Sequence, residues 1–342
     1  MKRSIALILV MLLLTGCAAP AAQPDSTQQY TATFLTLFDT VTTIIGRAET
    51  EEAFQKTAKS IHDDLLYYHE LFDIYNDYDG VNNIKTINDN AGIAPVKVEK
   101  AIIDLLLDCR QYYDLTGGRV NVAMGSVLQL WHEARNDGIR DPQNAKLPDM
   151  EALREAASHC TFDSVVIDAA ASTVYLADPH SCLDVGAVAK GWATQRAAEK
   201  APAGMLLSVG GNVCATGPKF ADGTPWVIGI QDPDAADKNL HTVFVTKGSV
   251  VTSGDYQRTY WVDGKAYHHI IDPDTLMPSA YWRSVSVICP DSGRADALST
   301  ALFLMDREAG AQLAEECGVE VLWVDASGQE FMTDGFEEIL RT

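Results

Sequence analysis

The spacing of apolar residues predicts helices over much of the N-terminal half of the chain. Apolar side chains return every three or four positions after Thr50, and Thr50 followed by Glu51 and Glu52 is a typical helix start. The residues on this first helical face are Phe54, Ala58, Ile61, Leu65 and Phe72. Similar spacing predicts helices over Val98–Leu115, in VLQLWHEA (127–134), from Asp149 to Ala157, after Asp184, and over Asp296–Asp306 and Arg307–Cys317.

Apolar runs of strand length dominate the C-terminal half. Thr31–Ile45 is predicted as one strand with a polar interruption at Asp39 and Thr40, and SVVID (164–168) and TVYLA (173–177) as two short strands. After Gly204 further strands follow quickly: MLLSVGG (205–211), VCATG (213–217), WVIGI (226–230), TVFVT (242–246), GSVVTSG (248–254), RSVSVIC (283–289), VEVLWVD (319–325) and GQEFMT (328–333). YQRTYWV and KAYHHII flank Asp263-Gly264, which predicts a hairpin with a type I′ turn. Helices first and strands later predict an α+β body.

The first residues form a segment that we exclude from the folded body. Lys2 and Arg3 precede an apolar run that is too short to span a bilayer, which is typical of a secretory signal. The following "LTGC" resembles the lipobox of bacterial lipoproteins, in which Cys17 becomes the lipidated first residue. We therefore expect a signal peptide at residues 1–16, a lipid-anchored tether at 17–30 and one folded domain at 31–342. That arrangement predicts a location on the outer side of the cell membrane.

Charge and cysteine content narrow the choice of partners. The formal net charge is -21, so the phosphate backbone of a nucleic acid would be repelled. Six cysteines follow Cys17, without a CxxC pair, which argues against a zinc site. Their even number permits disulfides outside the cytoplasm, but the sequence does not pair them.

Two segments carry candidate ligand groups. In ADALSTAL, Asp296 and Thr300 are four residues apart on a predicted helix, so their oxygens share one face and suit magnesium. The alternative is a plain helix start with Asp296 as N-cap. In LDVGAVAKGWA, small residues at a helix start, with Asp184 and Lys190, could accept an anion. The alternative there is close packing of a helix on a sheet.

The stretch AYHHIIDPDTLMP (266–278) places two histidines before a proline-containing turn. If the strand continues through them, His268 and His269 point to opposite faces, and only one can serve a given site. The alternative is a structural histidine. SVGGN (208–212) is most simply a turn, and Tyr75 could stack on a ligand ring or close the core.

Taken together, six segments in order resemble the signature series of the ApbE family, the FAD:protein FMN transferases. They are DVGAVAKG, SVGGNVCATG, WVIGIQDP, VVTSGDYQR, YHHIIDPDT and ADALSTALFLM. The resemblance implies a single α+β body with a mixed, mainly antiparallel sheet packed by helices. It also implies a magnesium-dependent transferase that moves FMN from FAD to a threonine or serine hydroxyl of a target protein and releases AMP. The expected acceptor is an extracytoplasmic redox subunit with a motif resembling Asp-x-x-Ser/Thr-Gly-Ala-Thr.

The resemblance also implies roles for individual residues. Those expected to contact FAD are Phe38, Tyr75, Asn121, Val122, Ala123, Asp184, Lys190 and Ile270. The expected metal ligands are the Ala187 carbonyl, Asp296 and Thr300. His269 is the hypothetical general base, and Asp272 either orients it or holds the turn. Leu276 stands where the family has glycine, which predicts a different turn conformation.

Two other functions remain open from the sequence. A metal-dependent FAD pyrophosphatase would split FAD to FMN and AMP, and family hydrolases differ at the position of Tyr75. A lipid-anchored flavin-binding protein without enzymatic activity would need the pocket but neither Asp296 nor Thr300.

Overall fold

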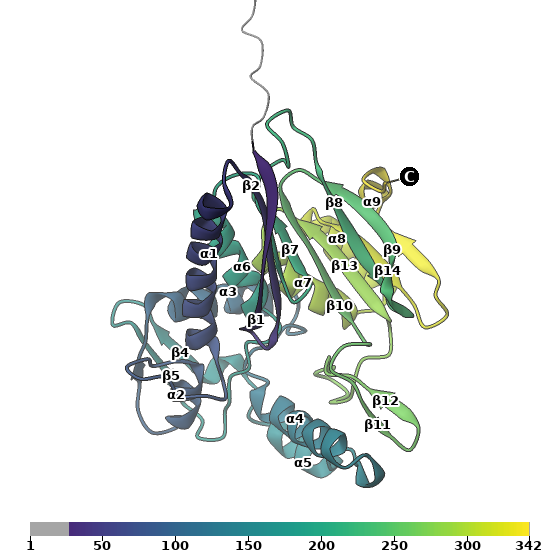
Figure 1. Ribbon diagram of the computed structural model, residues 1–342. Coiled ribbons are helices and arrows are strands. Elements are labelled where there is room, and N and C mark those ends of the chain that lie inside the picture. Colours follow the sequence, from purple (N-terminus) through teal and green to yellow (C-terminus); the bar gives the residue numbers. More distant parts are fainter. Residues whose placement is uncertain (1–26, 342) are drawn as a thin grey trace, which may run out of the picture.

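An antiparallel sheet of eight strands forms the centre of this computed structural model, which describes residues 27–341 (Figure 1). Its spatial order is β1-β2-β6-β7-β10-β13-β14-β15, and every neighbouring pair is antiparallel. The strands are β1 (Gln28–Leu37), β2 (Thr40–Ala48), β6 (Leu206–Val209), β7 (Asn212–Ala215), β10 (Gly248–Gly254), β13 (Ser284–Cys289), β14 (Glu320–Val324) and β15 (Glu330–Met332). The α+β prediction with a mainly antiparallel sheet is confirmed.

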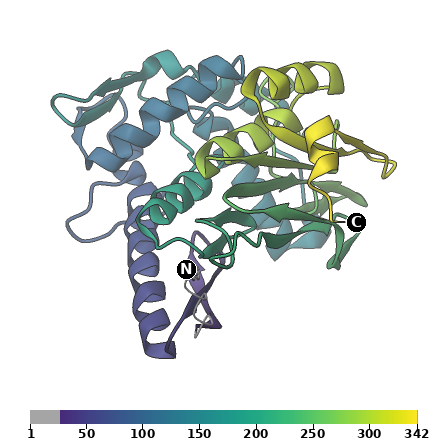
Figure 2. The same cartoon turned by 90° about the horizontal axis from the view of Figure 1, so that it is seen from above.

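Both faces of this sheet are covered, which explains its continuous apolar runs. Helices lie on one face, and the hairpin of β8 (Trp226–Asp232) and β9 (Ala235–Val245) lies on the other with α9 (Asp334–Glu338) (Figures 1 and 2). The helical layer contains α1 (Glu51–Phe72), α3 (Lys100–Leu115), α6 (Ala189–Lys200), α7 (Ser292–Phe303) and α8 (Arg307–Cys317). Adjacent residues of β10 therefore enter different cores, since Val250 packs toward the hairpin and Val251 toward the helices.

A smaller body packs at one end of the helical layer. Its own apolar cluster joins α4 (Gly125–Arg140) and α5 (Met150–Ala157) to the small hairpin of β11 (Tyr260–Val262) and β12 (Lys265–Tyr267) (Figure 1). Beside α1 lie α2 (Ile84–Asp89) and a three-stranded sheet of β3 (Val96–Lys97), β5 (Thr173–Leu176) and β4 (Val165–Asp168). Short 3-10 turns occupy Pro142–Asn144 and Phe162–Ser164.

Local sequence signals account for several boundaries. The Thr50 hydroxyl accepts a hydrogen bond from the Ala53 amide and caps α1, and the Asp149 carboxylate caps α5 in the same way. Asp263 and Gly264 have φ values of 50° and 75°, as the type I′ prediction requires. No helix within residues 27–341 is long and apolar enough to cross a bilayer. The six cysteines in that range are free thiols.

Two expectations about elements were wrong. Thr31–Ile45 is not one strand but most of the β1–β2 hairpin, which turns at Phe38 and Asp39 with φ values of 53° and 51°. The polar interruption at Asp39 and Thr40 marks this turn, but without a glycine it indicates only a break within one strand. The alternative of Asp296 as N-cap is also wrong, because α7 starts at Ser292 and Asp291 caps it.

The turn at Leu276 also departs from expectation. Leu276 has φ 60°, the left-handed conformation that a glycine would adopt, although its side chain is leucine. Its side chain is buried, its amide donates to the Asp272 carbonyl (2.8 Å), and its carbonyl accepts from Trp131 Nε1 (3.0 Å). Packing and these two bonds offset the local strain, so the substitution preserves the turn.

Candidate active site

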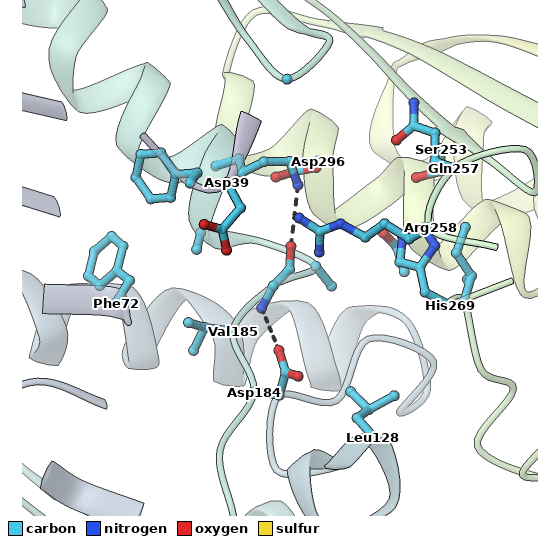
Figure 3. Close-up of a pocket in the computed structure, with 18 of the residues that line it drawn as sticks. Asp39, Phe72, Leu128, Asp184, Val185, Ser253, Gln257, Arg258, His269 and Asp296 are labelled. Atoms are coloured by element: carbon cyan, nitrogen blue, oxygen red, sulfur yellow. Dashed lines mark hydrogen bonds between the residues drawn. The ribbon is translucent and has the colours of Figure 1, made fainter. Parts of the chain in front are cut away.

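One large cavity, of about 420 Å³, lies where the helical layer, the sheet and the smaller body meet (Figure 3). Its walls come from the start of α6, the middle of α7, the end of β10, α4 and the loop after α1. Its volume is within the range of small-molecule sites. Ten of the sequence-predicted residues line it: Phe38, Tyr75, Asn121, Asp184, Ala187, Lys190, His269, Ile270, Asp296 and Thr300.

The start of α6 forms one wall of the cavity. The Gly186 amide donates to Asp184 Oδ1 (2.9 Å), and Lys190 Nζ donates to the Gly186 carbonyl (3.4 Å). Asp184 is nearly buried, whereas Gly186 is exposed. This segment therefore presents a cation and open backbone to any ligand in the cavity, at a helix start where amides lack helical partners.

Helices α6 and α7 meet at Gly191 and Asp296. The Gly191 amide donates to Asp296 Oδ2 (2.7 Å). Gly191 lies in the first turn of α6, where backbone amides have no helical partner, so the Asp296 carboxylate satisfies one of these amides. A Cβ on Gly191 would lie 2.4 Å from the Cβ of Asp296. This glycine therefore permits close packing against another helix, α7, and not against a sheet as the alternative proposed.

Asp296 is 4% exposed, and burial raises the pKa of its carboxyl, although Lys190 and the Gly191 amide oppose the shift. With Thr300 and the Ala187 carbonyl it offers oxygen atoms only, the donor type that magnesium prefers. Residues 27–341 contain no cluster of three or more histidine, cysteine or acidic side chains that could hold a metal. Any ion here would therefore need oxygens from its substrate or from water.

The two histidines do have different surroundings, although β12 ends before them at Tyr267. His268 bonds the Ser279 carbonyl (2.9 Å) and the Ile270 amide (3.2 Å), so it is structural. His269 lines the cavity, and its Nδ1 is buried without a hydrogen-bond partner. Burial, together with Arg258 and Lys190, lowers the pKa of His269 to about 3.

Three of the predicted contact residues do not line the cavity. Asp272 accepts hydrogen bonds from the amides of Asp274 (2.8 Å) and Thr275 (3.0 Å), so it holds the turn and does not contact His269. Val122 and Ala123 are fully buried in the core behind the wall. Cys17 lies outside the described residues.

Among the cavity residues that the sequence interpretation missed are His132 and Arg258. Tyr75 Oη lies 2.9 Å from His132 Nδ1, and His132 Nε2 lies 3.8 Å from Asp184 Oδ2. Arg258 is exposed on the loop after β10, has φ 47°, and extends into the cavity (Figure 3). His132 gave no signal because one histidine on an amphipathic helix is ordinary, and a loop arginine is equally common.

With this geometry in place, the comparisons with known proteins agree with one another. The sequence model described as "ApbE family" matches residues 38–323. The chain is 36% identical over 260 residues to the FAD:protein FMN transferase of Treponema pallidum, covering 70% of each chain. It is 30% identical over 280 residues to one from Klebsiella pneumoniae, covering 77% of this chain and 83% of that protein. The crystal structure of the ApbE protein of Thermotoga maritima aligns with a TM-score of 0.80 and 29% identity, covering 92% of this chain and all of that one.

Proposed function

The chain belongs to the ApbE family and is a flavin transferase, and we propose that it uses magnesium to transfer FMN from FAD to a threonine or serine hydroxyl of a target protein. The observation that carries this proposal is the convergence of Asp296, Thr300 and Lys190 on the same cavity as His269. An anionic dinucleotide, a hard cation and an entering hydroxyl could meet there.

The proposed reaction replaces a phosphoanhydride bond of FAD with a phosphoester bond to the acceptor. The acceptor hydroxyl oxygen bonds to the phosphorus of the FMN half of FAD, and the bond from that phosphorus to the bridging oxygen breaks. AMP leaves with the bridging oxygen, and the hydroxyl proton goes to a base. The products are AMP and a protein that carries FMN through a phosphoester.

Asp296, Thr300 and the Ala187 carbonyl would hold the metal ion. When bound, magnesium supplies positive charge that polarises the phosphates. Lys190 would bind the same phosphate oxygens as a point charge, and the exposed Gly186 leaves room for them to approach the start of α6. The other lining groups, Phe38, Tyr75, Asn121 and Ile270, would contact the flavin nucleotide.

His269 would take the proton of the entering hydroxyl. Its lowered pKa keeps the ring neutral at physiological pH, so one ring nitrogen has a free lone pair, and this would be Nε2 in the tautomer with hydrogen on Nδ1. The cations Arg258 and Lys190 contribute to this lowering, and a bound pyrophosphate would offset their charge. Substrate binding would therefore raise the basicity of His269 at the moment when a base is required.

We propose further that Cys17 is lipidated and that residues 17–30 tether the domain to the outer side of the cell membrane. The target would then be an extracytoplasmic domain of a redox subunit. This proposal rests on the "LTGC" segment and the signal-like residues before it.

Protein without residues 1–17, mixed with FAD, magnesium and an acceptor domain, tests the reaction. Intact-mass spectrometry follows the acceptor, and chromatography follows the nucleotides. We expect an acceptor heavier by one FMN and an equal amount of AMP. Free FMN and AMP with an unmodified acceptor would instead indicate the pyrophosphatase, and intact bound FAD the binding protein.

A further inference from the structure

Three neighbouring side chains from separate parts of the wall line one side of the cavity, and a hydrogen bond joins two of them, Tyr75 and His132. Tyr75 comes from the loop after α1, His132 from α4, and Asp184 from the segment before α6. Among the described residues, the bond between Tyr75 and His132 is the only side-chain hydrogen bond that joins α4 to the loop after α1. His132 lies between Tyr75 and Asp184.

Tyr75 depends on His132 for the position of its side chain. Asp73 fixes the backbone of this loop, since its carboxylate accepts from the amides of Tyr75 (2.6 Å) and Asn76 (3.1 Å). The Tyr75 side chain, however, is 56% exposed at the edge of the cavity, and within residues 27–341 its hydroxyl bonds only to His132. Without that bond the phenol would be free to swing toward solvent.

The direction of the bond follows from the protonation of the two groups. The ordinary pKa of a tyrosine phenol is about 10, so the Tyr75 hydroxyl keeps its proton at neutral pH and donates. Burial, with Arg135 and Arg258, lowers the pKa of His132, so its ring is neutral and Nδ1 accepts. Nε2 then carries the hydrogen and lies 3.8 Å from Asp184 Oδ2, which is too far for a hydrogen bond.

We propose that His132 is a positioning residue that holds the exposed Tyr75 ring at the edge of the cavity and so favours transfer of FMN to the acceptor hydroxyl over transfer to water. This inference rests on the proposed transferase function. Water attacking the same phosphorus would release the same AMP but give free FMN. A ring fixed at this edge restricts water around the bound FAD, while an acceptor segment can displace it only by making its own contacts.

The test compares three substitutions at His132 and reads the ratio of free FMN to FMN-bound acceptor. His132→Ala removes both partners. His132→Asn keeps an acceptor near the position of Nδ1 and can still hold Tyr75, whereas His132→Gln places its amide near Nε2 and can reach only Asp184. We expect the ratio to rise about fivefold in the Ala and Gln variants, the effect of one hydrogen bond, and to stay near wild type in the Asn variant.

Two further variants control for folding and for the bond itself. His159→Ala removes a comparable histidine, which pairs with Asp178 (2.6 Å) away from the cavity, and should leave the ratio unchanged. Tyr75→Phe removes the same bond from its other end, and combining it with His132→Ala should add little to either change. This pair keeps the test valid if His132→Ala folds poorly.

The possible outcomes distinguish a failure of the proposed transferase function from a failure of the role proposed for His132. If wild-type protein gives no FMN-bound acceptor, the transferase proposal fails, and this inference with it. If wild type transfers FMN but the Ala and Gln variants keep its ratio, only the role of His132 is overturned. Rescue by Gln and not by Asn would also overturn it, because His132 would then act through Asp184.

Discussion

At the scale of single residues, the site depends on ionisable groups whose surroundings change their chemistry. Burial destabilises the charged form of the Asp296 carboxyl and so raises its pKa. His269 is a buried imidazole beside cations, and its burial and these cations lower its pKa. The sequence could predict Asp296 and Thr300 because residues four apart on a helix share a face. It could not predict His132 or Arg258, whose roles depend on elements that only the fold brings together.

The low pKa of His269 can be measured directly. In the free protein we expect its ring to stay neutral from about pH 8 to about pH 4, because burial and Arg258 oppose protonation. NMR of labelled histidine rings measures this, and His159 is an internal reference because its bond to Asp178 raises its pKa. A His269 midpoint near the ordinary value of about 6.5 would contradict the account.

The same shift has a consequence for stability. Between about pH 3 and about pH 6.5 the unfolded chain binds a proton at His269 that the folded chain does not. This group's contribution to stability is therefore complete above the unfolded pKa and is lost as the pH falls toward the folded pKa.

At the scale of elements, the contact between α6 and α7 places the proposed metal ligands. Long helices and the Asp263–Gly264 hairpin could be predicted because their signals are local. The β1–β2 turn could not, since Phe38 and Asp39 adopt positive φ without a glycine. Nor could the sheet order, because strands buried on both faces show no alternation that would fix a neighbour.

Replacing Gly191 by Ala tests this contact. The new Cβ would lie 2.4 Å from the Ser292 carbonyl oxygen, so α6 and α7 must separate. We expect a loss of about 1–3 kcal/mol in the free energy of unfolding and a matching loss of transfer, measured by urea denaturation and by the acceptor assay.

Gly310→Ala is the matched control for that substitution. Gly310 is also a helical glycine, in α8, but its Cβ would meet Leu302 at an ordinary 3.6 Å. We expect this variant to be as stable as wild type or more stable by up to about 1 kcal/mol. Equal effects of the two substitutions on stability and transfer would show that close approach of α6 and α7 at Gly191 is not required for either.

At the scale of the whole molecule, an acidic protein must bind an anionic substrate. The formal net charge is -21, yet Arg258 and Lys190 both line the cavity. Arg258 has no described hydrogen-bond or ion-pair partner, whereas arginines such as Arg140 pair with nearby carboxylates. The cavity therefore offers cations that can contact phosphates, Arg119 among them, although the carboxylates of Asp39, Asp73, Asp184 and Asp296 also line it.

Arg258→Gln should weaken FAD binding about five- to tenfold at low salt and flatten its salt dependence, because one cation facing the ligand is lost. Titration of flavin fluorescence at several salt concentrations measures both effects. Arg140→Gln, which removes an exposed arginine paired with Asp137, should bind like wild type. If FAD affinity depends on salt concentration in the same way for Arg258→Gln and wild type, the charge of Arg258 does not contribute to FAD binding.

The central claim is that the cavity around Asp296 is where FMN is transferred, and Asp296→Asn tests it most directly. This change keeps the side chain's size and an acceptor for the Gly191 amide but removes the charge that would hold magnesium. The measurement is the rate of FMN-bound acceptor formation at saturating FAD and magnesium, beside FAD affinity and thermal stability. We predict a fall of at least about 100-fold in transfer, with FAD still bound and stability equal or higher, since a buried carboxylate is lost. Transfer within about twofold of wild type by a folded, FAD-binding variant would contradict the account.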